Sequence, residues 1–324
     1  MRPFLFCLFI VFISTAAMAQ TYRDEVGLRT DNDSYLPNRS DRYYTSGTFL
    51  YFNHALKIKA DSSSLANKIL GFEVGQKIFN PQSGVIPYVY YDDRPFAGYL
   101  YGSVNLNLLY KNESNLKLTA AFGVVGPAAL GQQSQDFIHN LFGQYTAEGW
   151  GYQIQNNVEV NLSAEYNRLL TRGKVADVSL TGYANLGMGF TGAGIGPMVR
   201  LGRFNQLYFS HSTGSAVTAN SKLTSLHTSE LYFYVKPQFN WVAYDATIQG
   251  GLGQTQAALA SNYFGTSDVT RHIEPLMYTQ QIGGVYSTRR WTFDLYVLWE
   301  TKDTREMVHH WHQWAALQVL YKFN

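Results

Sequence analysis

The sequence predicts an all-β fold, a transmembrane antiparallel β-barrel of twelve strands with a short helix in one extracellular loop. Composition is the first observation: the chain of 324 residues has 24 tyrosines, 28 glycines and only 15% charged residues. A helical membrane protein would need about 20 consecutive apolar residues, and no such run follows residue 20. The second observation is a strict alternation of apolar and polar residues, the pattern of strands that face lipid on one side and a polar lumen on the other.

Residues 1–19 have the features of a secretory signal peptide. A basic start precedes an apolar run and the pattern Ala-Met-Ala, so cleavage is expected before Gln20. This leaves residues 20–324 as one outer-membrane β-barrel domain. The only cysteine, Cys7, lies in the signal peptide, and a net charge of +2 does not indicate a nucleic-acid partner.

Strand positions follow from the alternation. In residues 157–167 every second residue is apolar, and the same pattern marks 229–242, 290–300 and the aromatic-rich end 311–323, which should close the barrel against the first strand. An even number of strands places both ends of the chain on the periplasmic side. Residues 203–228 are then an unusually long periplasmic connection. The predicted strands are 24–33, 43–54, 71–80, 96–110, 116–126, 154–170, 177–190, 193–202, 229–242, 276–287, 290–300 and 311–323.

With this topology, three unusual polar segments meet at the extracellular rim, and convergence of distant polar segments is what a functional site needs. They are residues 31–47, 90–98 and 123–143. The last contains the expected helix, residues 132–142, which has neither glycine nor proline. Asp136 precedes His139 by three residues, close enough on a helix to orient its ring.

Five motifs stand in these segments or, for the end of the last one, shortly after them. They are Asn32-Asp33, Tyr44-Thr45-Ser46-Gly47, Asp92-Asp93-Arg94-Pro95-Phe96-Ala97-Gly98, Gly123-Val124-Val125-Gly126-Pro127, and Gly131-Gln132-x-x-Gln135-x-x-x-His139 followed by Gly149-Trp150. With them the mature chain resembles, over essentially its whole length, the family of outer-membrane lipid A 3'-O-deacylases. The resemblance implies a twelve-stranded barrel with its site between the barrel wall and an extracellular helix.

The resemblance also implies the roles of individual residues. His139 would be the general base that activates water, with Asn32, Asp33 and Thr45 as the other site residues and Ca2+ as cofactor on Asp33 and Asn32. The chemistry agrees, because histidine titrates near neutral pH and a hard cation held by Asp and Asn oxygens can stabilise an oxyanion. The implied substrate is lipid A, or lipopolysaccharide, of the outer leaflet, and we expect a monomer.

Four further residues are expected to support the site. Gln135 and Asp136 would act from the helix, while Asp93 and Arg94 would act from the fourth strand, where Arg94 could bind a lipid phosphate bidentately. The alternative is that the run from residue 92 to residue 94 is a solvated salt-bridge cluster that supports the fold.

Alternation predicts how the first site residues point. If Leu50 and Phe52 face lipid, Thr45 and Asp33 point into the lumen and Asn32 points outward. The site would then straddle the wall, as suits a substrate anchored in the outer leaflet.

Two departures from the family leave the substrate open. The family has an acidic residue soon after the catalytic histidine, whereas here the nearest carboxylate is Glu148. A basic residue that some members carry between the third and fourth strands has no match. The alternatives are an outer-membrane phospholipase and a non-catalytic structural or surface-binding barrel. His309, His310 and His312 could form a metal patch, although an aromatic and imidazole girdle explains them better.

Overall fold

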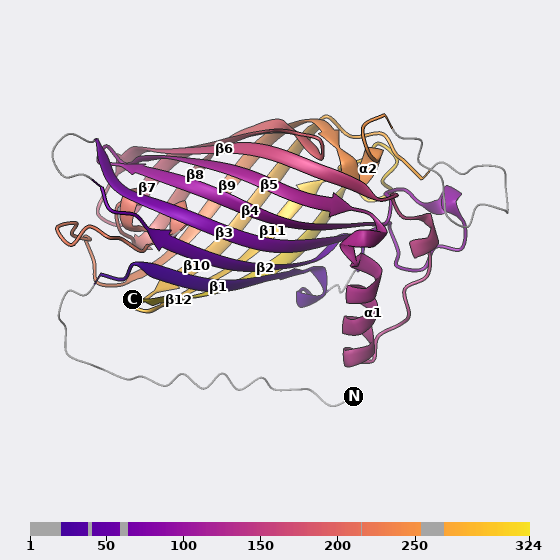
Figure 1. Cartoon of the computed structure of the whole chain (residues 1–324), viewed down its shortest axis with the longest axis horizontal. Coiled ribbons are helices and arrows are strands. Elements are labelled where there is room, and N and C mark those ends of the chain that lie inside the picture. The colour runs from indigo at the N-terminus through magenta and orange to yellow at the C-terminus, as the bar shows by residue number, and fades with distance from the viewer. Residues whose placement is uncertain (1–20, 38–40, 59–63, 215, 254–268) are drawn as a thin grey trace.

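The computed structural model describes residues 21–37, 41–58, 64–214, 216–253 and 269–324. Within them, twelve antiparallel strands form one closed barrel in which β1 pairs with both β2 and β12 (Figure 1). The strands are β1 Asp24–Asn32, β2 Tyr43–Ala55, β3 Leu65–Asn80, β4 Ala97–Tyr110, β5 Ser114–Val125, β6 Asn157–Arg172, β7 Ala176–Gly187, β8 Phe190–Arg203, β9 Glu230–Asp245, β10 Leu276–Ser287, β11 Trp291–Thr301 and β12 Trp311–Phe323. The predicted signal peptide, residues 1–19, lies outside the described residues.

Helical segments occupy the connections between strands. None of the described helices is long and apolar enough to cross a membrane. The α-helices are α1 Gly131–Phe142 and α2 Ala246–Gln249, and the 3-10 turns are η1 Asp33–Tyr35, η2 Val89–Tyr91, η3 Pro127–Ala129, η4 Trp150–Tyr152, η5 Leu207–Phe209 and η6 His211–Thr213.

The two faces of the wall have the predicted character. Along β2, Leu50 and Phe52 are exposed on the outside, while the preceding Phe49 is fully buried on the lumen side. The lumen also holds charged pairs, such as Lys117 with Glu165 at 3.0 Å. Apolar side chains outside and polar ones within are what a barrel in a bilayer requires.

The prediction of twelve strands is confirmed, and most strand ends agree within a few residues. The largest difference is at β3, which begins at Leu65 rather than residue 71. A register shift against β4 between Leu65 and Asn67 breaks the alternation at this point. The alternation of apolar and polar residues therefore did not mark the first residues of the strand.

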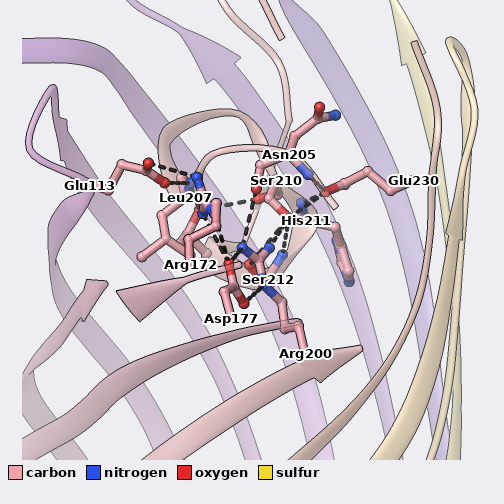
Figure 2. A network of polar contacts seen from close by, with 11 residues as sticks. Glu113, Arg172, Asp177, Arg200, Asn205, Leu207, Ser210, His211, Ser212 and Glu230 are labelled. Atoms are coloured by element: carbon pink, nitrogen blue, oxygen red, sulfur yellow. Dashed lines mark hydrogen bonds and ion pairs between the residues drawn. The ribbon is translucent and has the colours of Figure 1, made fainter. Parts of the chain in front are cut away.

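The long connection after β8 folds back into the periplasmic end of the barrel. No strand is found in its described part, and the segment is tied down by polar side chains from the strands around it (Figure 2). The buried Arg200 donates to Asp177 at 2.6 Å, to Ser210 at 2.9 Å and to Ser212 at 3.0 Å. Glu230 accepts from the Ser210 hydroxyl at 2.7 Å. The connection therefore acts as a plug beneath a polar cavity of about 290 Å³ in the lumen.

Candidate active site

Helix α1 is mounted on the outer side of the wall at the extracellular end of the barrel, opposite the end where the C-terminus lies (Figure 1). Gln76 of β3 donates to the Ala129 carbonyl at 2.7 Å, and Gln76 shares the lipid-facing side with the exposed Val74. Gly98 of β4 approaches equally closely, since a Cβ added there would lie 3.1 Å from Ala129 and from the Gly131 backbone. The helix thus meets the face of the barrel that elsewhere contacts lipid.

The sequence of α1 separates a buried side from an exposed one. Gln135 and His139 are buried toward the wall, whereas Phe137, Leu141 and Phe142 are 65–70% exposed. The helix ends at Gly143, whose φ of 64° is the left-handed conformation common at helix C-termini. The predicted helix at residues 132–142 is confirmed, and its exposed side is apolar.

His139 is held at both ring nitrogens. Its Nδ1 lies 2.7 Å from the Tyr145 carbonyl oxygen, and its Nε2 lies 3.3 Å from Asp41 Oδ2. A carbonyl oxygen can only accept, so Nδ1 carries a hydrogen. The Asp41 carboxylate, helped by the Tyr145 carbonyl, raises the pKa of His139 above its ordinary value in spite of burial.

Asp41 is the centre of the polar cluster. Its carboxylate accepts from Thr45 Oγ1 at 2.6 Å, from Asn80 at 3.2 Å, from Gln135 at 3.3 Å and from the Tyr145 hydroxyl. Burial would raise the pKa of Asp41, but hydrogen bonds from His139, Thr45 and Tyr145 outweigh burial and hold that pKa below its usual range. At neutral pH the cluster therefore contains a carboxylate next to an imidazole with raised proton affinity.

The orientation predicted for Thr45 is wrong. A β-bulge interrupts the pairing of β2 with β3 between Tyr44 and Ser46. Tyr44 is turned to the lumen, where it donates to Asp31 and packs on the Trp314 ring. The extra residue lets Thr45 contact Asp41 on the outer side, which strict alternation would have forbidden.

Asp33 and Asn32 lie where β1 ends. Asp33 is buried in η1, and its carboxylate accepts from the Arg42 backbone N–H at 2.9 Å and lies 3.2 Å from Thr45 Oγ1. Because the strand stops at Asn32, the alternation that predicted Asp33 to point into the lumen no longer applies. Asn32 caps η1 by accepting from the Ser34 N–H at 2.7 Å.

The donor types at this point fit a calcium ion in part. Asp33 offers a carboxylate with several lone pairs, and Asn32 Oδ1 keeps one lone pair beyond its bond to Ser34. Among the described residues no group of three or more His, Cys, Asp or Glu side chains is arranged to hold a metal. A calcium ion here would therefore need amide, hydroxyl or water oxygens besides Asp33.

Of the expected supporting residues, Gln135 is at the site and Asp136 does not hold the ring. Gln135 accepts from Trp150 Nε1 at 2.8 Å while its amide donates to Asp41. The ring of His139 is oriented by Asp41 and Tyr145 instead of Asp136. The prediction about Gln135 is thus compatible with the geometry, whereas the orienting carboxylate comes from a different loop.

Asp93 and Arg94 are buried in a different part of the rim. Arg94 pairs with Asp303 at 2.8 Å and donates to Thr247 at 3.0 Å. Asp93 accepts from the Tyr43 hydroxyl at 2.8 Å. Both residues fasten the loop before β4 to neighbouring loops, which agrees with the alternative of a structural cluster, although the cluster is buried rather than solvated.

The remaining candidates take structural positions. Glu148 is exposed, and its backbone forms an isolated bridge with Val85. His309 accepts from Arg42 at 3.0 Å, while the buried His312 stacks on Trp314. In the described part of the chain the three histidines of this segment form no metal cluster.

Sequence reasoning missed Asp41, Asn80 and Tyr145. Asp41 stands within the polar segment 31–47, but nothing in its spacing distinguishes it from Asp31 or Asp33. Its position depends on a left-handed backbone, with φ 42°, and on the bulge at Thr45. Glycine often marks left-handed residues and bulges in a sequence, but neither of these two positions is a glycine.

Comparison with known proteins adds the following. A model of the protein family described as outer membrane protein LpxR matches residues 4–323. The solved structure of LpxR from Salmonella typhimurium matches with a TM-score of 0.72 at 19% identity, over 92% of this chain and 100% of that chain, and so has the same fold. Two other barrels match more weakly. The KdgM porin in complex with disordered oligogalacturonate matches with a TM-score of 0.38 at 9% identity, over 93% of this chain and 99% of that chain. The β domain of the Bordetella autotransporter BrkA matches with a TM-score of 0.42 at 9% identity, over 94% of this chain and 100% of that chain, and both are too distant to inform on function. No curated protein matches the chain.

Proposed function

The chain belongs to the LpxR family of outer membrane proteins, and from this membership and the geometry around His139 we propose that it is an esterase that removes the 3'-linked acyloxyacyl group of lipid A. As a member of that family it is a protein of the outer membrane of a Gram-negative bacterium. Its substrate would be lipid A, or lipopolysaccharide, of the outer leaflet.

One observation carries the proposal. A buried histidine, 5% exposed, lies between the lipid-facing side of the wall and a helix whose far side is apolar. A solvated loop histidine would have no reason to be held at both ring nitrogens. A lipid that diffuses in the outer leaflet can present an ester bond to this position without leaving the membrane.

The reaction follows from the arrangement of His139. Its Nε2 takes a proton from a water molecule, and the water oxygen attacks the ester carbonyl carbon. The bond from that carbon to the lipid A oxygen then breaks, and the proton passes from Nε2 to the departing oxygen. The products are a fatty acid and a free hydroxyl group on lipid A. The hydrogen bond from Nδ1 to the Tyr145 carbonyl keeps Nε2 as the reacting nitrogen throughout.

The proposal includes Ca2+ as cofactor. Asp33 and Asn32 would hold the ion at the end of β1. When bound there, a calcium ion supplies positive charge for the oxyanion that forms on the ester carbonyl oxygen. Thr45, which lies between the carboxylates of Asp33 and Asp41, offers a hydroxyl that can orient water or substrate.

The test uses the purified barrel in detergent micelles with lipid A or phospholipid as substrate. We expect fatty acid to be released from lipid A, and His139→Gln to reduce the rate by roughly 100-fold or more, because removal of a general base has effects of that order. A chelator should lower the rate and added Ca2+ should restore it. If fatty acid is released from phospholipid but not from lipid A, the protein is a phospholipase. If a folded barrel releases no fatty acid from either lipid, the protein is a non-catalytic surface protein.

A further inference from the structure

We propose that Asp41 is the positioning residue of the His139 base: its carboxylate orients the ring from beside Nε2, which stays the nitrogen that takes the proton from water, and it balances the charge of the imidazolium that then forms. This inference deepens the proposed function and rests on it, because it presumes that His139 acts as a base. The acidic partner of the histidine, which the family resemblance places soon after the helix, is here supplied by Asp41 in the connection between β1 and β2.

Each ring nitrogen of His139 faces an acceptor. Nδ1 faces a carbonyl oxygen and Nε2 faces a carboxylate oxygen at 3.3 Å, so both partners are acceptors. A neutral imidazole has one nitrogen without a hydrogen, and that lone pair would face the charge of Asp41. The pair therefore favours proton uptake at Nε2, which makes His139 a stronger base and stabilises the protonated ring afterwards.

Asp41 is itself held rigidly by its neighbours. Donors from four different elements or loops, namely Thr45, Asn80, Gln135 and the Tyr145 hydroxyl, converge on its two oxygens. These bonds occupy much of the accepting capacity of the carboxylate, so Asp41 is suited to hold the ring rather than to take protons itself. A positioning group must be fixed by its own neighbours in this way.

Three other carboxylates stand near His139 in the structure or in the sequence. Asp136 lies one turn earlier on α1 and contributes only a weaker coulombic effect on His139. Asp33 lies beyond Thr45, and the exposed Glu148 follows the helix. In the described part of the chain, Asp41 is the carboxylate that forms an ion pair with His139.

Tyr145 joins the two halves of the pair. Its backbone carbonyl accepts from Nδ1 of His139, and its hydroxyl donates to Asp41. Tyr145 alone, three residues beyond the end of the helix, therefore fixes both the tautomer of His139 and the position of the Asp41 carboxylate. The segment after α1 supplies no acidic side chain to His139, but it orients the His139 ring through these two contacts of Tyr145.

The experiment compares Asp41→Asn with Glu148→Gln in the full-length mature barrel. Asparagine is suited to test the charge because, like aspartate, it tolerates the left-handed backbone found at residue 41. Glu148→Gln removes the same charge from the carboxylate nearest to the helix in the sequence. Two readouts are taken: the His139 titration by NMR with labelled histidine, and the pH profile of kcat/KM for lipid A hydrolysis.

We expect Asp41→Asn to move the pKa of His139 down and the acidic limb of kcat/KM to lower pH by the same interval. Its kcat should fall on the order of 100-fold with little change in KM. Glu148→Gln should change neither readout. Either of two results would overturn the assignment. One is a His139 pKa in Asp41→Asn that equals the wild-type value. The other is an unshifted pH profile of kcat/KM in which the variant differs from wild type only by a higher KM.

The two readouts separate this inference from the proposed function. If Asp41→Asn shifts the His139 titration but the wild-type barrel releases no fatty acid, the pairing stands and the proposed function fails. Where Asp41→Asn does not fold, Tyr145→Phe gives the opposite test. It removes a donor from Asp41 and keeps the carbonyl, so the His139 titration should move up, and a titration that stays in place would overturn the assignment.

Discussion

At the scale of single residues, the ion pair of His139 and Asp41 couples stability to pH. The pKa of His139 is raised in the folded protein, so its contribution is fully present below the unfolded value of about 6.5 and is lost as pH rises through the folded value. The pKa of Asp41 is lowered, so its contribution is present above about 3.9 and is lost as pH falls through the folded value. The pair should stabilise the fold most between these limits.

This coupling gives a prediction for His139→Gln. The loss in free energy of unfolding relative to wild type should be largest between about pH 4 and pH 6.5 and should shrink toward pH 9. Urea titration of the micelle-bound barrel at several pH values measures it. A loss that is independent of pH would show that the ring contributes by packing and that its charge is not paired.

At the scale of elements, the mounting of α1 depends on a close approach of two backbones. Gly98 of β4 faces Gly131 of α1, and a Cβ at either position would crowd the other backbone or the Trp150 ring. Larger side chains at residue 98 must therefore push the helix, with His139, away from the wall.

We predict that Gly98→Leu abolishes lipid hydrolysis while the barrel still folds. The matched control is Gly102→Leu on the same strand and the same lipid-facing side, where an added Cβ would meet nothing within 4 Å. Hydrolysis rate and the heat-dependent gel mobility of the folded barrel are measured for both. Equal rates in the two variants would contradict the account of how the helix is mounted.

The periplasmic plug is an element whose attachment depends on buried charge. Arg200 is fully buried and joins Asp177 to Ser210 and Ser212 of the plug (Figure 2). Removing one partner of such a network leaves the others desolvated, at a cost of about 3–5 kcal/mol. The plug is therefore expected to be part of the cooperative fold.

We predict that Arg200→Met lowers the free energy of unfolding by about 3–5 kcal/mol. Arg203→Met, on the same strand, should cost about 0.5 kcal/mol or less because Arg203 is exposed and bonds only Ser229 among its described contacts. Urea titration of both variants checks this. Similar losses in the two would mean that the plug is not held by the buried network.

At the scale of the whole molecule, the barrel and its family followed from the sequence because both rest on repeated or local patterns. Alternation marked strands such as those at 157–167, 229–242, 290–300 and 311–323, and the predicted count of twelve is confirmed. The motifs around Asn32, Thr45 and His139 led to the family that the comparison confirms. The position of Asp41 could not be read in the same way. It depends on a bulge in β2 and on the left-handed backbone of Asp41 itself.

The plug was predicted only as a long connection. Its polar residues, such as Ser210 and Ser212, resemble those of an ordinary loop, and their partners Asp177 and Arg200 stand on strands where charge is expected to face the lumen. Only the closed barrel brings these groups together, so the pattern along one strand does not predict the contact.

We propose above that this chain removes an acyloxyacyl group from lipid A with His139 as base. The most direct measurement is a mass spectrum of lipid A from cells that make the hexa-acylated form and express either the wild-type chain or His139→Ala. We expect loss of one acyloxyacyl unit with the wild type and unchanged lipid A with the variant. Unchanged lipid A in the presence of a folded wild-type barrel would contradict the claim.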